Sequence, residues 1–168
     1  MRDAIEEEIS EARRLYGVHQ RVLSSHQSLS HKLARYRECI ERTDRSMREI
    51  GIAGACSACA KKAGSCCFRE IENCYDRVAL LVNLLLKAPL PEKREIEGNC
   101  YFLGERGCKL IARDSFCINY LCGKLKTDLG SSAVTRFSAV AGEEIYCGWQ
   151  IELILRKWLA AEVGSTAK

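Results

Sequence analysis

Residues 71–87, IENCYDRVALLVNLLLK, contain the longest apolar segment of the 168-residue chain. The apolar side chains of this stretch occupy nearly every face of a helix, and Asn83 is the polar interruption among them. A helix that is apolar all round is typical of a protein core. Pro89 and Pro91 follow and cannot continue the helix. The stretch therefore predicts a central buried helix over about 69–87, against which the rest of the chain packs.

Residues 1–50 predict a long helical arm, either one helix or two helices broken near Gly17. This segment contains no proline and many Glu and Arg residues, which are good helix formers. Its apolar residues recur at a spacing of three or four, as in helices that pack along a partner. The seam consists of Leu15, Val22, Leu29, Leu33, Tyr36 and Ile40. We expect the seam to bind a second copy of the chain or another protein.

The rest of the chain predicts a further helix and a small irregular insertion. Ser131 or Ser132 can cap a final helix, preceded by a linker over 123–132. Two short runs around the tetrapeptide GERG, 99–103 and 108–112, predict a β-hairpin, and a cysteine-rich loop is expected over 51–67. The expected fold class is mainly α: a helical bundle with a small β-hairpin-containing, cysteine-rich, metal-binding insertion. The chain is expected to divide into three regions. These are the arm at 1–50, the cysteine-cluster region with the buried helix at 51–125, and the C-terminal helix, packed on the same core, at 126–168.

Composition restricts the location and the partners of the protein. The charged N-terminus shows no signal peptide, and no apolar run is long enough to span a membrane, so a cytoplasmic protein without a membrane partner is expected. Lys and Arg exceed Asp and Glu by only 26 to 22, which gives no support for nucleic-acid binding. No nucleotide-binding, hydrolase or kinase motif is present, so the sequence assigns no reaction.

The chain contains 11 cysteines, an odd number that excludes complete pairing in disulfides. In a reducing compartment such clusters are typical of metal or redox sites. Eight of them form two groups and are the candidate metal ligands: Cys56, Cys59, Cys66 and Cys67, then Cys100, Cys108, Cys117 and Cys122. Four thiolates suit both zinc and iron–sulfur clusters. Adjacent cysteines can hardly reach one small ion, so Cys66 and Cys67 serve two different metals or flank one larger cluster.

Three cysteines and one acidic pair receive a structural interpretation. Cys74 is expected to be a buried structural thiol rather than a ninth ligand. Cys39 and Cys147 are expected to be small hydrophobic residues buried on helices. Glu143 and Glu144 favour a solvated helix turn over a ligand or acid–base pair.

The cysteine pattern resembles the YkgJ-type family of zinc- or iron-chelating cysteine-cluster proteins. CSACAKKAGSCC, residues 56–67, is similar to the first motif of that family, and CYFLGERGCKLIARDSFCINYLC, residues 100–122, is similar to the second. The resemblance implies that the eight cysteines named above are the metal ligands. It covers only residues 56–122, and Asp114 replaces the usual proline while Ile118 replaces the usual arginine.

Two hypotheses of different classes follow from the sequence. In the first, the protein holds an iron–sulfur cluster, with an electron-transfer or redox accessory role, or a structural zinc. In the second, the arm at 1–50 is a protein-interaction or dimerisation module, and the metal only stabilises the fold.

Overall fold

The computed structural model describes residues 4–60 and 65–166, and this part of the chain is mainly helical with one small antiparallel hairpin. The predicted fold class is confirmed. The elements are, in order, α1 (Ala4–Ser25), α2 (Gln27–Glu49), α3 (Ile52–Ala60), the 3-10 helix η1 (Arg69–Cys74), α4 (Arg77–Leu85), β1 (Leu103–Gly104), β2 (Gly107–Cys108), α5 (Ser115–Asn119) and α6 (Gly123–Thr166).

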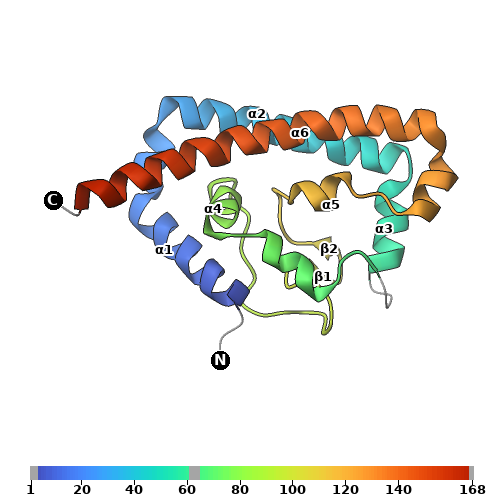
Figure 1. Ribbon diagram of the computed structural model, residues 1–168, viewed down its shortest axis with the longest axis horizontal. Helices are drawn as coiled ribbons and strands as arrows, with labels where there is room; N and C mark the ends of the chain where they lie inside the picture. Colours follow the sequence, from blue (N-terminus) through green and yellow to red (C-terminus); the bar gives the residue numbers. More distant parts are fainter. Residues whose placement is uncertain (1–3, 61–64, 167–168) are drawn as a thin grey trace.

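Two long helices, α2 and α6, run side by side in opposite directions along one face of the molecule (Figure 1). Helix α1 turns away from α2 and packs against α4. Helix α4 lies beneath the long pair. The cysteine-bearing segments, including the hairpin and α5, occupy the remaining space below α2 and α6. No helix of the described residues is long and apolar enough to cross a membrane.

Helix α4 is the centre of the core, as its sequence predicts. One side of it, with Val78, Leu81 and Val82, packs in a cluster that also contains Ile151 and Leu155 of α6. The other side contributes Leu80 to a second cluster. The helix is shorter than expected, because residues 69–74 form a 3-10 helix and Asp76 begins a new helix.

The seam of the N-terminal arm is largely covered by the chain itself. Leu15, Leu29, Tyr36 and Ile40 are buried in the same cluster as residues of α4 and α6. Val22 remains 55% exposed. The apolar spacing therefore reflects packing within the chain at most of these positions.

The break in the arm lies at His26, so the expectation of a break near Gly17 is wrong. His26 has an extended backbone conformation, and its Nδ1 accepts a hydrogen bond from the backbone N–H of Leu29. This side-chain cap satisfies a free N–H group in the first turn of α2. The cost of Gly17 in a helix, about 1 kcal/mol, is small beside the packing of α1.

Two segments expected to be irregular are helical. Residues 52–60 form α3, which is rich in alanine, the best helix former. Gly51, with φ of 83°, separates α3 from α2 in the left-handed conformation that favours glycine at a helix end. The expected linker at 123–132 is the first part of α6, interrupted only at Gly130, where φ is 75° and ψ is 158°.

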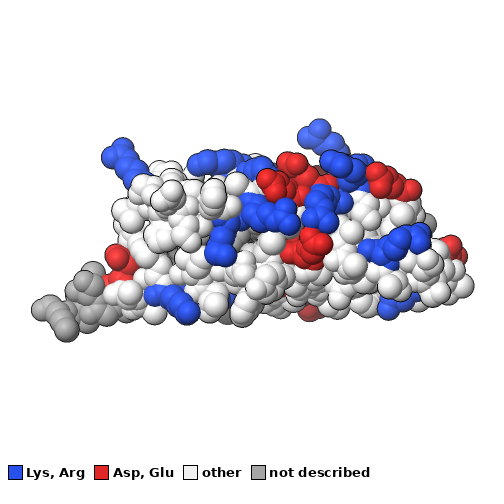
Figure 2. Space-filling view, turned by 90° about the horizontal axis from the view of Figure 1, so that it is seen from above, with Lys and Arg blue, Asp and Glu red and all other residues white. Residues whose placement is uncertain are grey.

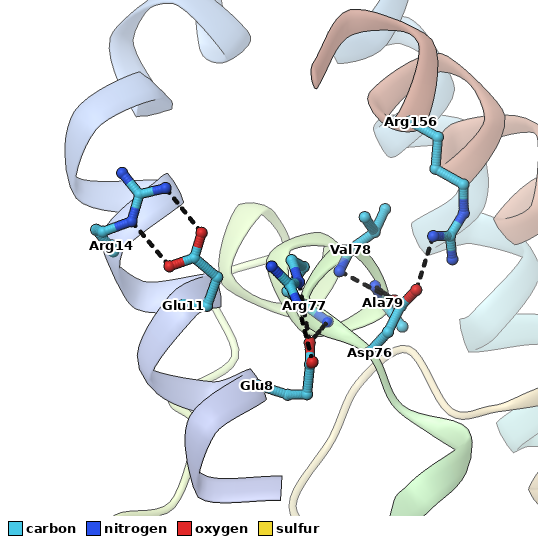
Figure 3. Close-up of polar contacts among 8 residues, drawn as sticks. All are labelled: Glu8, Glu11, Arg14, Asp76, Arg77, Val78, Ala79 and Arg156. Atoms are coloured by element: carbon cyan, nitrogen blue, oxygen red, sulfur yellow. Dashed lines mark hydrogen bonds and ion pairs between the residues drawn. The ribbon is translucent and has the colours of Figure 1, made fainter. Parts of the chain in front are cut away.

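Polar contacts connect α1, α4 and α6 at the start of the central helix (Figure 3). Asp76 Oδ1 accepts hydrogen bonds from the backbone N–H groups of Val78 and Ala79, both at 3.0 Å. Its Oδ2 accepts one from Arg156 of α6 at 2.7 Å. The next residue, Arg77, donates from its backbone and its guanidinium to Glu8 of α1. These contacts fix where the central helix begins relative to both of its neighbours.

We expect Asp76→Ala to lower the free energy of unfolding by about 1–2 kcal/mol at pH 7, because the helix loses its N-cap. Burial raises the pKa of Asp76, but hydrogen bonds from Arg156 and the two capping N–H groups outweigh it and leave the pKa below its usual 3.8. The stabilisation is thus present above that value and is lost as the pH falls through the lower native pKa. Urea unfolding at pH 7 and pH 3 measures this change. An equal loss at both pH values would contradict it.

Candidate metal centre

The eight candidate ligands come from six places in the fold. Cys56 and Cys59 lie on the last turns of α3, and Cys66 and Cys67 lie between α3 and η1. The remaining four lie before β1, at the end of β2, on α5 and just before α6: Cys100, Cys108, Cys117 and Cys122. The tertiary structure therefore decides which of them are neighbours.

Hydrogen bonds place Cys100 beside Cys67. The backbone N–H of Cys100 donates to the carbonyl of Cys67 at 2.9 Å. Asn99 Nδ2 donates to the same carbonyl at 3.1 Å and to the carbonyl of Ala60 at 2.8 Å. Phe68 and Asn99 also form an isolated antiparallel bridge. The segment that follows α3 and the segment that precedes the hairpin are thus held together along their backbones.

The hairpin and α5 bring two further cysteines to this pair. Cys108 pairs with Leu103 across the hairpin, and the N–H of Leu103 donates to the carbonyl of Cys100 at 2.9 Å. The hydroxyl of Tyr75 lies 3.7 Å from Cys117 Sγ and accepts a hydrogen bond from the N–H of Asp114 at 2.8 Å. Tyr75 therefore fixes the loop before α5. We call Cys67, Cys100, Cys108 and Cys117 the inner set.

The electrostatics of the inner set agree with this grouping. Burial raises the pKa of Cys67 to about 12, with contributions from Cys66 and from the other three members. Burial also raises the pKa of Cys117 to about 12, and Cys108 and Cys100 contribute to that shift. Each thiolate would therefore repel the others, and the thiols keep their protons at neutral pH while no cation is near.

The other four candidates form an outer set: Cys56, Cys59, Cys66 and Cys122. Burial raises the pKa of Cys56, with further contributions from Cys66, Cys122 and Cys59. The pKa of Cys66 is raised by burial and then by Cys59, with a contribution from Cys122. Cys59 and Cys122 of the outer set are exposed, whereas in the inner set Cys108 is exposed and Cys100 is buried. The outer set thus faces solvent more than the inner set does.

The donor atoms suit a thiolate-bound metal, but the sulfur atoms of each set do not lie close enough together to bind one as they stand. Among residues 4–60 and 65–166, no three His, Cys, Asp or Glu side chains are gathered closely enough to hold a metal ion as they stand. Each set nevertheless supplies four thiols, the number that a zinc site or an iron–sulfur cluster takes. Side-chain rotation would have to bring the sulfurs of a set together.

Arg113 lies between the two sets. Its Nη2 pairs with Asp44 of α2 at 2.6 Å. Burial raises the pKa of both Cys56 in the outer set and Cys108 in the inner set, and the positive charge of Arg113 offsets part of each rise. A cation in this position favours thiolates on both sides.

Cys74 lies apart from both sets. It ends η1 and is exposed, so the expectation of a buried thiol is wrong. Desolvation raises its pKa, and the charged neighbour that contributes is Asp114 rather than a candidate ligand. The 3-10 geometry of η1 turns Cys74 to the surface, where an α-helix over 69–87 was expected.

Two buried polar residues, Glu72 and Asn83, support the site, and sequence reasoning assigned them no role. Glu72 is 4% exposed and binds Arg94 and the backbone N–H of Tyr101, the residue after Cys100. Asn83 donates to the carbonyl of Ala112 and accepts from the N–H groups of residues 111 and 112, which precede Arg113. A polar residue inside an otherwise apolar helix was the sequence signal for Asn83.

Glu144 is also buried, and the expectation of a solvated turn at Glu143 and Glu144 is wrong for this residue. Glu143 is exposed and pairs with Arg42, but Glu144 is fully buried on the side of α6 that faces α2. Neither of its carboxyl oxygens has a hydrogen-bond partner at bonding distance. Burial raises the pKa of Glu144, although Thr43 and Arg113 lower it in part.

No protein-family model, curated protein or solved structure matches this chain. The similarity of its cysteine spacing to the YkgJ-type family stays a prediction.

Proposed function

We propose that this protein binds metal at two neighbouring four-cysteine centres, one made by the inner set and one by the outer set. The observation that supports this is that the charges of the outer-set cysteines act on one another and those of the inner set act on one another, with Cys66 and Cys67 in contact where the two sets meet. A single four-ligand site would leave four clustered thiols without a role. The resemblance to the YkgJ-type family points to the same eight residues.

Metal binding would resolve the electrostatic conflict within each set. The thiols of Cys67, Cys117 and Cys100 hold their protons because burial and mutual repulsion oppose ionisation. A bound cation replaces those protons and offsets the repulsion between thiolates. A reducing compartment such as the cytosol would keep the thiols available for this.

The two sets favour different roles because they differ in exposure. The inner set connects the segment after α3, the hairpin and α5, so a metal there would stabilise the folding of the insertion. The outer set reaches the surface through Cys59 and Cys122, and the inner set only through Cys108. A redox-active cluster at the outer set could exchange electrons with a partner, whereas zinc at either set would be structural.

Metal content and absorbance of the full chain, purified without oxygen, test this proposal. Zinc at about two ions per chain with a colourless protein supports two structural centres. Iron with acid-labile sulfide and a broad visible band supports iron–sulfur clusters, and both metals together support one centre of each kind. Protein that folds without metal and retains 11 freely titratable thiols would overturn the proposal.

A further inference from the structure

A second kind of cysteine site lies between the two long helices, away from the candidate metal centre. Cys39 of α2 and Cys147 of α6 face each other, with their Sγ atoms 3.4 Å apart. Cys39 is 1% exposed, whereas Cys147 is half-buried. Both are small residues within the contact of α2 and α6, as expected, but their mutual contact is a feature that the sequence did not reveal.

We propose that Cys39 and Cys147 are a site of reversible oxidation and form a disulfide that joins α2 to α6. A disulfide has an S–S length of about 2.05 Å, so the sulfurs need to approach by only about 1.35 Å. Both lie well inside long helices that pack side by side, so the encounter does not depend on a mobile segment. This inference is independent of the proposed metal binding, because neither residue belongs to the inner or outer set.

The surroundings of the two cysteines favour a defined order of reaction, and the oxidant that we propose is a hydroperoxide. Burial raises the pKa of Cys39 to about 11, and the contact with Cys147 adds to the shift, so Cys39 remains a thiol at neutral pH. Cys147 is the more accessible of the two and reacts first. Above them, Arg42 and Arg35 pair with Glu143, at 2.6 and 3.9 Å. Figure 2 shows such interspersed positive and negative side chains over this face.

The chemistry balances with one hydrogen peroxide per disulfide. Cys147 gives up its proton as its sulfur attacks one peroxide oxygen; the O–O bond breaks, a sulfenic acid forms, and the released hydroxide takes up that proton as water. The sulfur of Cys39 then attacks the sulfenic sulfur, the S–O bond breaks, and water leaves with the proton of Cys39. Two thiols are oxidised to one disulfide, and the peroxide is reduced to two waters. A thiol reductant reverses the change by exchange.

Peptide mapping of the full chain tests this inference. The reduced protein is treated with increasing hydrogen peroxide, blocked with iodoacetamide and digested with trypsin without reduction. We expect a linked pair of peptides, 38–42 and 137–156, with a mass about 2 Da below the sum of the two free thiol peptides. Cys74, which is exposed and lies outside both sets, reports the dose at which a surface thiol is oxidised.

Two variants and a stability measurement distinguish the site from general thiol oxidation. Cys39→Ser should abolish the linked peptides and leave a sulfenic acid on Cys147 that dimedone traps, whereas Cys74→Ser should leave the linkage unchanged. Oxidation should raise the thermal midpoint of the parent protein by several degrees, but not that of Cys39→Ser or Cys147→Ser. Recovery of Cys39 and Cys147 unlinked, or linked to other cysteines, at a dose that oxidises Cys74 would overturn the inference. That result would leave the metal centres untouched.

Discussion

Cys66→Ser and Cys67→Ser should each remove one metal centre and leave the other, although the two residues are adjacent in the chain. In the proposed arrangement, Cys66 shares a centre with Cys56, Cys59 and Cys122, whereas Cys67 shares one with Cys100, Cys108 and Cys117. Loss of one of four thiolates leaves an open coordination position and one charge fewer at that centre. We therefore expect each variant to retain about half of the parent metal content after gel filtration in a competing chelator, measured by elemental analysis.

Double variants make this experiment more specific. Two substitutions within one set and two substitutions in different sets are expected to remove different amounts of metal. Cys66→Ser with Cys122→Ser alters one set twice and should lose no more metal than Cys66→Ser alone. Cys66→Ser with Cys67→Ser alters both sets and should lose nearly all of it. Cys74→Ser is the matched control and should keep the full metal content of the parent protein, since Cys74 is exposed and lies apart from both sets. Equal and complete loss in both single variants would instead indicate one shared cluster.

Glu72→Gln should destabilise the protein by about 3–5 kcal/mol, because it removes one charge of a buried ion pair. The side chains of Arg94 and Glu72 are only 9% and 5% exposed, and their closest approach is 2.6 Å. The same carboxylate accepts a hydrogen bond from the N–H of Tyr101 at 2.6 Å, and Arg94 also donates to the carbonyl of Asn99. Glutamine keeps the shape of the side chain but leaves Arg94 charged and buried. Urea unfolding at pH 7 measures the loss.

The control for this prediction is an exposed ion pair of the same protein. Glu143→Gln removes the partner of Arg42, and both side chains are about half exposed. That substitution should cost less than about 1 kcal/mol. Glu72 accepts a hydrogen bond from the N–H of Tyr101 and binds Arg94, which donates to the carbonyl of Asn99. Because these contacts lie on either side of Cys100, Glu72→Gln should also weaken metal retention by the inner set. A loss at Glu72 as small as that at Glu143 would show that the buried pair contributes little.

Local sequence patterns predicted those parts of the fold that depend on local forces. The apolar run that includes Leu80 and Leu81 predicted the buried central helix, and the GERG tetrapeptide predicted the hairpin, although its strands are only two residues long. Helix boundaries were less predictable. The cap at His26 and the cap at Asp76 each depend on one side chain that accepts a hydrogen bond from the backbone. Aspartate is a preferred N-cap residue and histidine is not, but apolar periodicity alone pointed to neither position.

Buried polar residues were the least predictable part of the candidate site. Glu144 follows Glu143 in the sequence, yet one is fully buried and the other is exposed. The difference arises because α6 rotates adjacent residues by about 100°, and only the neighbouring α2 determines which side is covered. Glu72 likewise has its partner 22 residues away in Arg94. Periodicity alone does not show such long-range pairs.

By itself, the sequence determined that this is a mainly helical protein with a cysteine-rich insertion and eight candidate ligands, because composition, spacing and apolar periodicity are properties of the chain. Only the tertiary structure decided how those cysteines are grouped. Cys122 joins the cysteines of α3, and Cys67 joins those of the hairpin and α5. It also placed Cys39 against Cys147. The physical reason is that chain folding, and not sequence distance, sets the separation between side chains on different elements.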